Sequence, residues 1–559
     1  MNHSTFKSFT FGIGLFFTLP LVYGNSSSPS SSDGTLYINK SKTHKVAPVK
    51  YGFHYEEIGM MGEGALHAEL IRNRSFEEAT PPAGLSVKNG LYENVPAPRV
   101  KEKKVFQADP LIGWTTYPLS YTPVFISRTD ENPMSGENKY SMLVNVTEDI
   151  ANHSDALILN RGYYGMNLKT DTSYRLSLFL KNRNYSAPLR VFLVDEWGQR
   201  VSNVIEVNVG NRDWTKYTGE LKPEKNVRRG MFAIQPMSKG QFQIDVVSLF
   251  PSDTWNDGKS VFRKDIVQNL KEFSPSFIRF PGGCIVHGVN EETMYHWKKT
   301  LGPIENRPGQ WSKWAPYYRT DGIGYHEFYE LCEYVGADAM YVMPTGMICS
   351  GWVKQSPQWN FRHIDVDLDA YIQDALDAIE YAIGDTTTKW GAERAKNGHP
   401  APFPLKYIEI GNEDFGPVYW ERYEKIYQAL SAKYPDLVYI ANSVIRVVGR
   451  ENDDKRKDIP NFVNPKNVKV FDEHYYNSIE WACEPSPVQA PAHTVLEEVT
   501  NGYEPKSISS IVPCAPSQST LLPSFNRLFT SCSLSTKWNC FRYSIPSNHA
   551  FSSSVRSYS

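Results

Sequence analysis

The sequence predicts an α/β protein in which an all-β module interrupts a series of alternating strands and helices. From Ser260 onward, helical segments alternate with short apolar strands such as 339–344 and 437–443, and such repeated units place their strands in parallel. Between about 89 and 255, short segments of alternating polarity are separated by turn residues, which is typical of an antiparallel β-sandwich. These observations predict a (β/α)8-type TIM barrel with an inserted β-sandwich module.

The composition excludes some functional classes and leaves others open. The chain has 559 residues with 41% hydrophobic content, which is enough for two or three domains. A net charge of −2 gives no sign of a nucleic-acid partner or of an anionic membrane surface. The 33 Tyr, 28 Phe and 13 Trp suit a sugar-binding surface, but a well-filled β core needs the same residues, so their abundance alone decides nothing.

The N-terminus predicts export. Residues 1–24 have the composition of a cleavable signal peptide, with Lys7 before an apolar stretch over 9–21 and small residues ahead of the expected cleavage site. A buried strand or a membrane anchor is the alternative, but the apolar stretch is too short to span about 30 Å of bilayer. A Ser-rich linker over 25–34 follows. We therefore expect a secreted or periplasmic protein with no membrane partner.

The elements follow in order along the chain. Residues 35–88 hold two predicted strands, 35–38 and 49–58, and a helical pattern that begins in the Gly-rich stretch near residue 60. The sandwich, placed at 89–255, takes its strands from 140–146, 156–162, 174–181, 189–195, 204–210 and 242–250. Barrel strands two to six fall within 256–482, at 275–280, 339–344, 405–410, 437–443 and 468–476, with helices at 262–273, 324–335, 368–383 and 419–433. About six barrel strands are found where eight are needed, so the barrel is predicted to be incomplete.

Polar residues recur where the predicted barrel strands end. The strand at 405–410 stops at Gly411 and is followed by Asn412 and Glu413. Each such residue alone has an ordinary structural explanation, such as a turn cap or a hydrogen-bonded core histidine. Because the carboxyl ends of barrel strands converge on one rim, we expect the polar residues of four strands to meet in one pocket. They are Glu56, Cys284, Asn412, Glu413, Glu473, His474 and Tyr476.

Several long stretches of the chain resemble glycoside hydrolase family 51, the α-L-arabinofuranosidases. They are YGFHYEEI, HAELIRNRSFEE, FIRFPGGCIVHG, WKKTLGPIENRPG, DGIGYHEFYELCEYVGADAMYV, KYIEIGNE and VFDEHYYNSIEW, and they lie within residues 35–482. The inserted sandwich is similar to the carbohydrate-binding-type module of that family. The resemblance implies hydrolysis, with retention, of terminal non-reducing α-L-arabinofuranosyl groups of arabinans or arabinoxylans, that is, an enzyme of L-arabinose metabolism.

The resemblance also implies roles for individual residues. Glu413 corresponds to the general acid/base, which protonates the leaving oxygen and later deprotonates water. Asn412 is expected to hold the 2-hydroxyl of the sugar. Glu56, Cys284 and Tyr476 are expected to line the furanose pocket, and His474 fits the same strand-six pattern. The resemblance implies no metal and no organic cofactor, and the cysteines have no metal-ligand spacing.

The second carboxylate of a retaining site is not found. The family places its nucleophilic glutamate at the end of strand seven, but after Trp481 the resemblance stops. Residues 483–559 contain 17 Ser, 8 Pro and four of the seven Cys, and no Asp or Glu occurs from Pro505 to the end. This composition predicts an aberrant, disordered tail, as a truncated or frame-shifted gene would give. Glu504 is a weak candidate for the nucleophile.

Three functional hypotheses follow from these observations. The first is an arabinofuranosidase whose turnover is impaired because the nucleophile strand is missing. The second is a non-catalytic carbohydrate-binding protein that uses the sandwich and a surviving pocket. The third, a retaining glycosidase of the same barrel type that acts on glucans, is disfavoured by WKKTLGPIENRPG and RNRSFEE. The partner expected in every case is a carbohydrate, and the sequence does not determine the oligomeric state.

Overall fold

The structure is a computed structural model that describes most of the chain between residues 51 and 476. The predicted signal peptide, the Ser-rich linker, the strand at 35–38 and Glu504 lie outside the described residues. The described residues are 51–82, 85–93, 107–118, 122–150, 156–312, 314, 317–349, 361–442, 446–447, 463–476 and 506–509.

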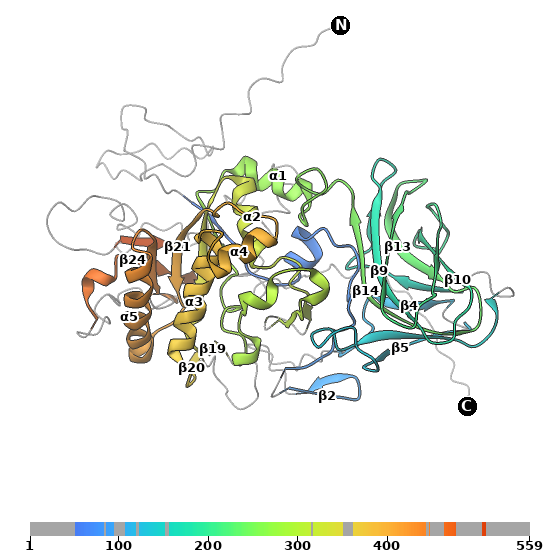
Figure 1. The fold of residues 1–559 in the computed structure, drawn as a ribbon, viewed down its shortest axis with the longest axis horizontal. Coiled ribbons are helices and arrows are strands. Elements are labelled where there is room, and N and C mark those ends of the chain that lie inside the picture. Colours follow the sequence, from blue (N-terminus) through green and yellow to red (C-terminus); the bar gives the residue numbers. More distant parts are fainter. Residues whose placement is uncertain are drawn as a thin grey trace, which may run out of the picture.

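A parallel sheet forms the first of two regions (Figure 1). Its seven strands lie side by side in the order in which they occur along the chain, and every neighbouring pair is parallel. This singly wound order is that of a barrel wall, although in the described part of the chain the outermost strands do not pair with each other. The strands are β1 (Phe53–His54), β15 (Phe277–Phe280), β18 (Asp338–Met343), β21 (Leu405–Ile410), β22 (Val438–Asn442), β24 (Val470–Glu473) and β26 (Lys506–Ser509).

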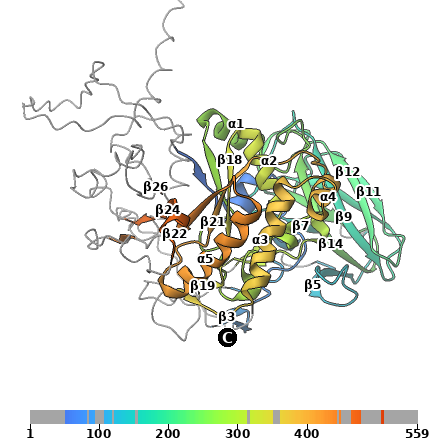
Figure 2. The same cartoon turned by 60° about the vertical axis from the view of Figure 1, so that its left-hand side comes forward.

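The seventh strand corrects the sequence-based count of six. β26 lies inside the segment predicted to be disordered, and it pairs with β24 so that Lys506 lies beside Val470 and Ser509 beside Glu473. Its sequence, KSIS, has one apolar residue and no recognisable strand pattern. Pairing with a neighbouring edge, rather than intrinsic propensity, makes this segment a strand. Figure 2 shows β26, β24, β22 and β21 following one another across the sheet.

Five helices belong to this region. Four of them were predicted from the sequence, with bounds that agree to within a few residues, because their apolar residues recur at helical spacing. The fifth, over 389–396, was not predicted and packs against the helix at 368–383. On α3, for example, Ala375, Ala378, Ile379 and Ala382 are buried in the same hydrophobic cluster as Ile408 of β21. The helices are α1 (Lys264–Phe273), α2 (Tyr325–Val335), α3 (Leu368–Ile383), α4 (Lys389–Lys396) and α5 (Gly416–Lys433).

The second region is the predicted β-sandwich, built from two antiparallel sheets (Figure 1). The sheets face each other across an apolar core that includes Val144, Leu178, Phe232 and Ile244. Five of its strands, β4, β5, β8, β12 and β13, were not predicted from the sequence. The first sheet has the order β11 (Ile205–Asn208), β10 (Pro188–Val194), β13 (Val227–Gln235), β7 (Leu157–Asn160) and β4 (Trp114–Tyr117), and β8 (Met166–Leu168) also pairs with β13. The second sheet has the order β12 (Thr215–Leu221), β9 (Tyr174–Asn182), β14 (Gly240–Pro251), β6 (Ser141–Val146) and β5 (Val124–Thr129).

The segment after β1 differs from the predicted helix. Only Gly62–Leu66 forms a helical turn, and the chain then runs along the sandwich in an extended form. Its backbone hydrogen bonds go to other segments, from Ala68 N to Val261 O (2.8 Å) and from Leu70 N to Leu249 O (3.1 Å). The apolar residues that suggested helical spacing are divided between two cores, because Leu66 packs in the barrel and Ile71 in the sandwich.

Short strand pairs and single-turn helices make up the other described elements. No helix in the described part of the chain is long and apolar enough to cross a membrane. The short pairs are β2 (Ser86–Lys88) with β3 (Leu91–Glu93), β16 (Gln310–Trp311) with β17 (Tyr318–Arg319), β19 (Met347–Cys349) with β20 (Phe361–His363), and β23 (Arg446–Val447) with β25 (Tyr475–Tyr476); single-turn helices lie at Glu291–Thr293, Trp297–Thr300, Ile304–Asn306 and Pro465–Asn467.

Candidate active site

The carboxyl ends of three strands bring predicted site residues into contact. Glu413 follows β21, and its Oε1 lies 2.7 Å from Nδ1 of His474, which follows β24. The Sγ of Cys284, in the turn after β15, lies 3.8 Å from Oε2 of Glu413. All three side chains are largely or fully buried. The convergence expected from the sequence is therefore present around Glu413.

Glu56 lies next to this group, on the segment that follows β1. Its Oε1 accepts hydrogen bonds from Ile285 N (3.1 Å) and from Trp314 Nε1 (2.7 Å). The two glycines of the PGG turn make room for it, since a Cβ at Gly282 would lie 2.6 Å from the Glu56 Cβ. Gly283 is similarly close to the Glu56 carboxylate. The turn is thus fitted to one glutamate side chain.

Three of the predicted residues, Glu473, Tyr476 and Glu504, are not placed in the site at the level of their side chains. The backbone of Tyr476 belongs to β25, which pairs with β23. Its side chain and Glu504 lie outside what the structure describes.

The turn that presents Glu413 has a demanding backbone. Glu413 has φ +53°, a left-handed conformation that costs energy for a residue with a side chain. Gly411 has φ +89°, and a Cβ there would lie 2.6 Å from Asp414 Oδ2. Asp414 holds the turn in place, because it contacts His287 Nε2 (2.8 Å) and Thr345 Oγ1. The position of Glu413 is therefore imposed by its surroundings.

A charged layer lies inside the sheet next to Glu413. Arg279 of β15 forms a bidentate ion pair with Glu409 of β21, at 2.6 Å for both hydrogen bonds. The same guanidinium donates to Asn412 Oδ1 (2.8 Å) and lies 3.4 Å from Asp472 Oδ2. Burial opposes the charge on Arg279, but the Glu409 and Asp472 carboxylates outweigh it and raise the pKa of Arg279. Arg279 is therefore a fixed cation at the centre of the site.

The arrangement also fixes the amide of Asn412. Arg279 donates a hydrogen bond to Asn412 Oδ1. The buried Nδ2 of Asn412 has no hydrogen-bond partner among the described residues. A buried donor without a partner is costly, so this nitrogen suits a ligand that accepts a hydrogen bond.

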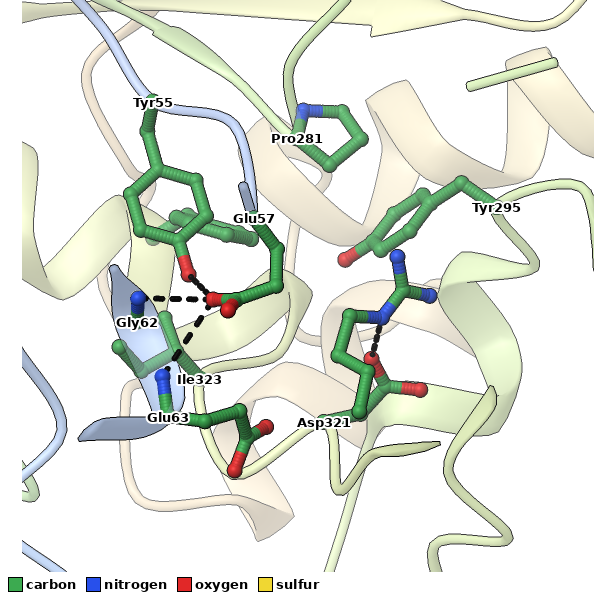
Figure 3. A pocket seen from close by; sticks show the side chains of 10 residues that line it. Tyr55, Glu57, Gly62, Glu63, Pro281, Tyr295, Asp321 and Ile323 are labelled. Carbon is green, nitrogen blue, oxygen red and sulfur yellow. Dashed lines mark hydrogen bonds and ion pairs between the residues drawn. The ribbon is translucent and has the colours of Figure 1, made fainter. Parts of the chain in front are cut away.

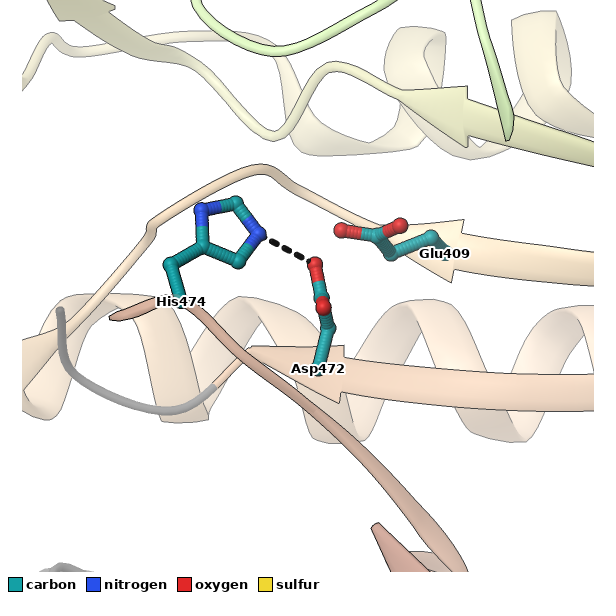
Figure 4. A group of neighbouring side chains, drawn as sticks. All are labelled: Glu409, Asp472 and His474. Carbon is teal, nitrogen blue, oxygen red and sulfur yellow. Dashed lines mark hydrogen bonds and ion pairs between the residues drawn. The ribbon is translucent and has the colours of Figure 1, made fainter. Parts of the chain in front are cut away.

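His474 lies between two carboxylates. Its Nε2 is 2.6 Å from Oδ2 of Asp472 (Figure 4). Its Nδ1 is 2.7 Å from Oε1 of Glu413. Burial disfavours the imidazolium, but Asp472 and then Glu413 stabilise it and raise the pKa of His474 to about 10. Burial also opposes ionisation of Asp472, yet His474 and Arg279 lower the pKa of Asp472 below its ordinary range. We therefore expect both groups to be charged at neutral pH.

Glu409, Asp472 and His474 have the donor atoms of a metal site, all within 4.8 Å of one another. Their neighbours argue for another use. The Glu409 carboxylate is already occupied by both arms of Arg279, and both His474 nitrogens face carboxylates. The guanidinium supplies the positive charge that a metal ion would supply. We assign no metal to these residues.

Sequence reasoning missed Arg279, Glu409 and Asp472. Each is a charged residue within a short apolar strand, in FIRF, LKYIEI and VFDE. A charge inside a buried strand is costly unless a partner compensates it. That pattern, repeated in three strands of one sheet, could have revealed the network.

A pocket among the described residues lies beside this site and not in it. It has an empty volume of about 290 Å³ and is lined by Glu57, Glu63, Tyr55 and Asp321 among others (Figure 3). Glu57 accepts hydrogen bonds from Gly62 N (2.7 Å) and Tyr55 OH (3.0 Å), which makes it a structural carboxylate. Burial and the nearby Glu57 raise the pKa of Glu63 to about 8. None of the predicted site residues lines this cavity.

Proteins with similar sequences are described as α-L-arabinofuranosidases. The profile of the "Alpha-L-arabinofuranosidase 1 domain" family matches residues 269–489. An extracellular exo-α-L-arabinofuranosidase of Streptomyces chartreusis is 30% identical over 445 residues, which cover 77% of this chain and 48% of that protein. α-L-Arabinofuranosidase 1 of Arabidopsis thaliana is 30% identical over 398 residues, covering 70% of this chain and 53% of that protein.

A solved structure extends the agreement to three dimensions. The arabinose-bound MgGH51 α-L-arabinofuranosidase superposes with a TM-score of 0.63 at 25% identity, covering 79% of this chain and 64% of that one. The chain spans about half the length of the curated relatives it matches. Over the part that it shares with these proteins, the chain belongs to glycoside hydrolase family 51.

Proposed function

We propose that this site is the acid/base half of a retaining α-L-arabinofuranosidase, which removes terminal non-reducing α-L-arabinofuranosyl groups from plant cell-wall polysaccharides. The observation that carries the proposal is the placement of Glu413 at the carboxyl end of β21, in contact with His474 and Cys284. In this role Glu413 protonates the leaving oxygen and then takes a proton from the attacking water. The buried Nδ2 of Asn412 is available to donate to a sugar hydroxyl.

We further propose that turnover by this chain is impaired. Retention needs a second carboxylate roughly 5–5.5 Å from the first, at a point where it can attack the anomeric carbon. In this fold the seventh strand is the expected source, but β26 runs KSIS and its carboxyl end carries Ser509. Glu504 precedes β26 by two residues in the sequence. A serine hydroxyl without an adjacent base is a weak nucleophile.

The test is hydrolysis of 4-nitrophenyl α-L-arabinofuranoside with and without added azide. A small anion can occupy the place of a missing nucleophile while Glu413 still protonates the leaving group. We expect little release of nitrophenol without azide, faster release with it, and an arabinosyl azide of inverted configuration. Glu413→Gln should reduce the azide-dependent rate.

The possible results separate the two parts of the proposal. Hydrolysis without azide that Glu413→Gln abolishes would support the activity and refute the impairment. If azide has no effect and arabinose binding cannot be detected by calorimetry, the proposed function is wrong.

Secretion is part of the proposal. The Streptomyces relative is described as extracellular, and residues 1–24 have the composition of a signal peptide. N-terminal sequencing of the exported protein should begin near Asn25. A mature protein that retains residue 1 would contradict cleavage.

A second candidate function is carbohydrate binding by the sandwich. Trp197 and Tyr164 are 73% and 74% exposed there, and exposed rings of this kind can cover the apolar face of a sugar. If the sandwich holds the polysaccharide, the full-length Trp197→Ala variant should be retained less on insoluble arabinan, while Glu413→Gln should be retained as well as the unchanged chain. Equal retention of the Trp197→Ala variant would exclude this ring.

A further inference from the structure

The inference concerns Asp472, which has no role in the predictions made from the sequence. Asp472 and His474 are two residues apart around the end of β24, and their side chains touch (Figure 4). The Asp472 Oδ2 to His474 Nε2 distance is 2.6 Å, and the His474 Nδ1 to Glu413 Oε1 distance is 2.7 Å. The imidazole therefore has a carboxylate oxygen at hydrogen-bond distance from each ring nitrogen.

This geometry constrains the number of hydrogens. A neutral imidazole has one N–H and therefore satisfies one of two carboxylates. Two short contacts need two hydrogens along the line Asp472–His474–Glu413. The hydrogen facing Asp472 has no alternative place, because that carboxylate is held in its ionised form beside Arg279. The other hydrogen can lie on His474 Nδ1 or on Glu413.

We propose that Asp472 is a positioning residue that keeps one hydrogen of His474 on Nε2, so that His474 Nδ1 and Glu413 share one exchangeable proton. The inference rests on the proposed function, because it assigns Glu413 the acid/base role. His474 then stores the proton that glycosidic cleavage consumes.

The proton transfer balances within these residues. The Nδ1 proton moves to Glu413 Oε1, which leaves a neutral imidazole whose remaining hydrogen is on Nε2 and directed to Asp472. Glu413 gives the proton to the leaving oxygen. When Glu413 later takes a proton from water, it can return that proton to Nδ1, and the original state is restored.

The charges around His474 come from every strand packed against it. Asp472 and Glu413 favour a positive imidazole, and the cation Arg279 on β15 opposes it. Burial and Arg279 lower the pKa of His54 on β1, so that ring is neutral, and burial raises the pKa of Glu409 on β21 to about 8. The cation Arg279 is bound closely by Glu409, which reduces its effect on His474. Asp472 is the carboxylate that acts most strongly on His474 and is not itself the acid/base.

The experiment is a titration of the full-length chain labelled with ¹⁵N in its 13 histidines, followed by NMR. His474 is assigned by the signal that disappears in His474→Gln. In the unchanged chain we expect its pKa near 10 and a hydrogen on Nε2 at every pH where the chain is folded. In Asp472→Asn we expect a His474 pKa lower by about one to three pH units, since a partner charge is removed.

A matched control uses a histidine–carboxylate pair at the surface, away from the site. His399 Nε2 lies 2.9 Å from Glu333 Oε2, at the surface and outside the site. Glu333→Gln should change the His399 signal and leave that of His474 unchanged. A general loosening of the protein would change both, whereas loss of the positioning contact changes only His474.

Each outcome is informative. A His474 that titrates near 6.5 in the unchanged chain, or that carries its hydrogen on Nδ1 when neutral, would overturn the proposal, and this measurement needs no variant. An unchanged His474 pKa in Asp472→Asn would do the same. Restoration of a high pKa in Asp472→Glu would support it, since the charge is returned.

The titration does not depend on turnover, so the two proposals can fail separately. If the His474 pKa is near 10 but neither hydrolysis nor azide-dependent release occurs, the shared proton is supported and the proposed activity is wrong. If hydrolysis occurs and the His474 pKa is near 6.5, the activity is supported and the proposed role of Asp472 is wrong.

Discussion

The barrel and the sandwich bury charged groups in opposite ways. In the barrel, Arg279, Glu409, Asp472 and His474 are buried together and contact one another. In the sandwich core, Asp245 is fully buried, one of its oxygens has no partner among the described residues, and burial raises the pKa of Asp245 well above its ordinary value. Asp245 is therefore tolerated in the sandwich as a neutral acid, while Asp472 in the barrel is kept charged by His474 and Arg279.

The difference indicates where selection for function has acted. A network of buried ion pairs contributes little net stability, because desolvation offsets much of the attraction. A core made of apolar side chains is the simpler way to hold a fold together, and the sandwich follows it with Val144, Leu178 and Phe232. Charges retained inside the barrel next to Glu413 therefore point to chemistry.

The largest expected effect is that of removing the central cation. Arg279→Met would leave Glu409 and Asp472 buried without their partner and should lower the free energy of unfolding by about 3–5 kcal/mol. Urea denaturation followed by circular dichroism measures this. Arg307→Met is the matched control, because Arg307 also forms a bidentate pair, with Glu327, away from the site.

The control separates stability from binding. Both variants should lose stability, but only Arg279→Met should weaken arabinose binding, since Arg279 orients Asn412. Equal loss of binding in the two variants would mean that the charged layer has no specific role in the site.

Asp245→Asn tests the opposite arrangement in the sandwich. Because the folded-state pKa of Asp245 is raised, the folded chain holds a proton that the unfolded chain releases above its ordinary pKa near 4, and stability falls as pH rises from there toward the folded pKa. The variant should lack this dependence, so its stability relative to the unchanged chain should grow by up to about 1.4 kcal/mol per pH unit above pH 5. Thermal unfolding from pH 5 to pH 7 measures it.

The pH dependence of stability due to Asp472 has the opposite sign to that due to Asp245. Its folded pKa is lowered, so its contribution is complete above its ordinary pKa and is lost only as the pH falls below about 4. A pH dependence of the same sign for Asp245 and Asp472 would break the comparison between the two regions.

The smallest effect is expected at the boundary between the regions. Lys216 of β12 lies 2.9 Å from Glu305 in the barrel part, and both side chains are accessible to solvent. Lys216→Met should cost less than about 1 kcal/mol and should matter less at high salt. A larger loss would show that the two regions depend on each other for stability more than their separate cores suggest.

The sequence predicted the elements that show apolar periodicity and the site residues that follow strand ends. Helix 368–383 and the strand leading to Glu413 follow from apolar spacing, and Cys284 and His474 follow from their positions at strand ends. The segment from Leu66 to Ile71 mimicked a helix because its apolar residues serve two different cores. β26 was not predicted because its pairing with β24 makes it a strand, and Asp472 was not predicted because its role depends on the charge of His474. Both depend on tertiary contacts.

The contacts of Arg279 have a consequence for the order of folding. The sandwich takes its strands from Trp114 to Pro251, so it can close while the rest of the chain is still being synthesised. The Arg279 side chain instead joins His54, Glu409 and Asp472, which are separated by more than 400 residues from first to last. Such distant partners meet slowly. The polypeptide emerging from the ribosome can therefore carry a finished sandwich before residue 472 arrives and completes the contacts of Arg279.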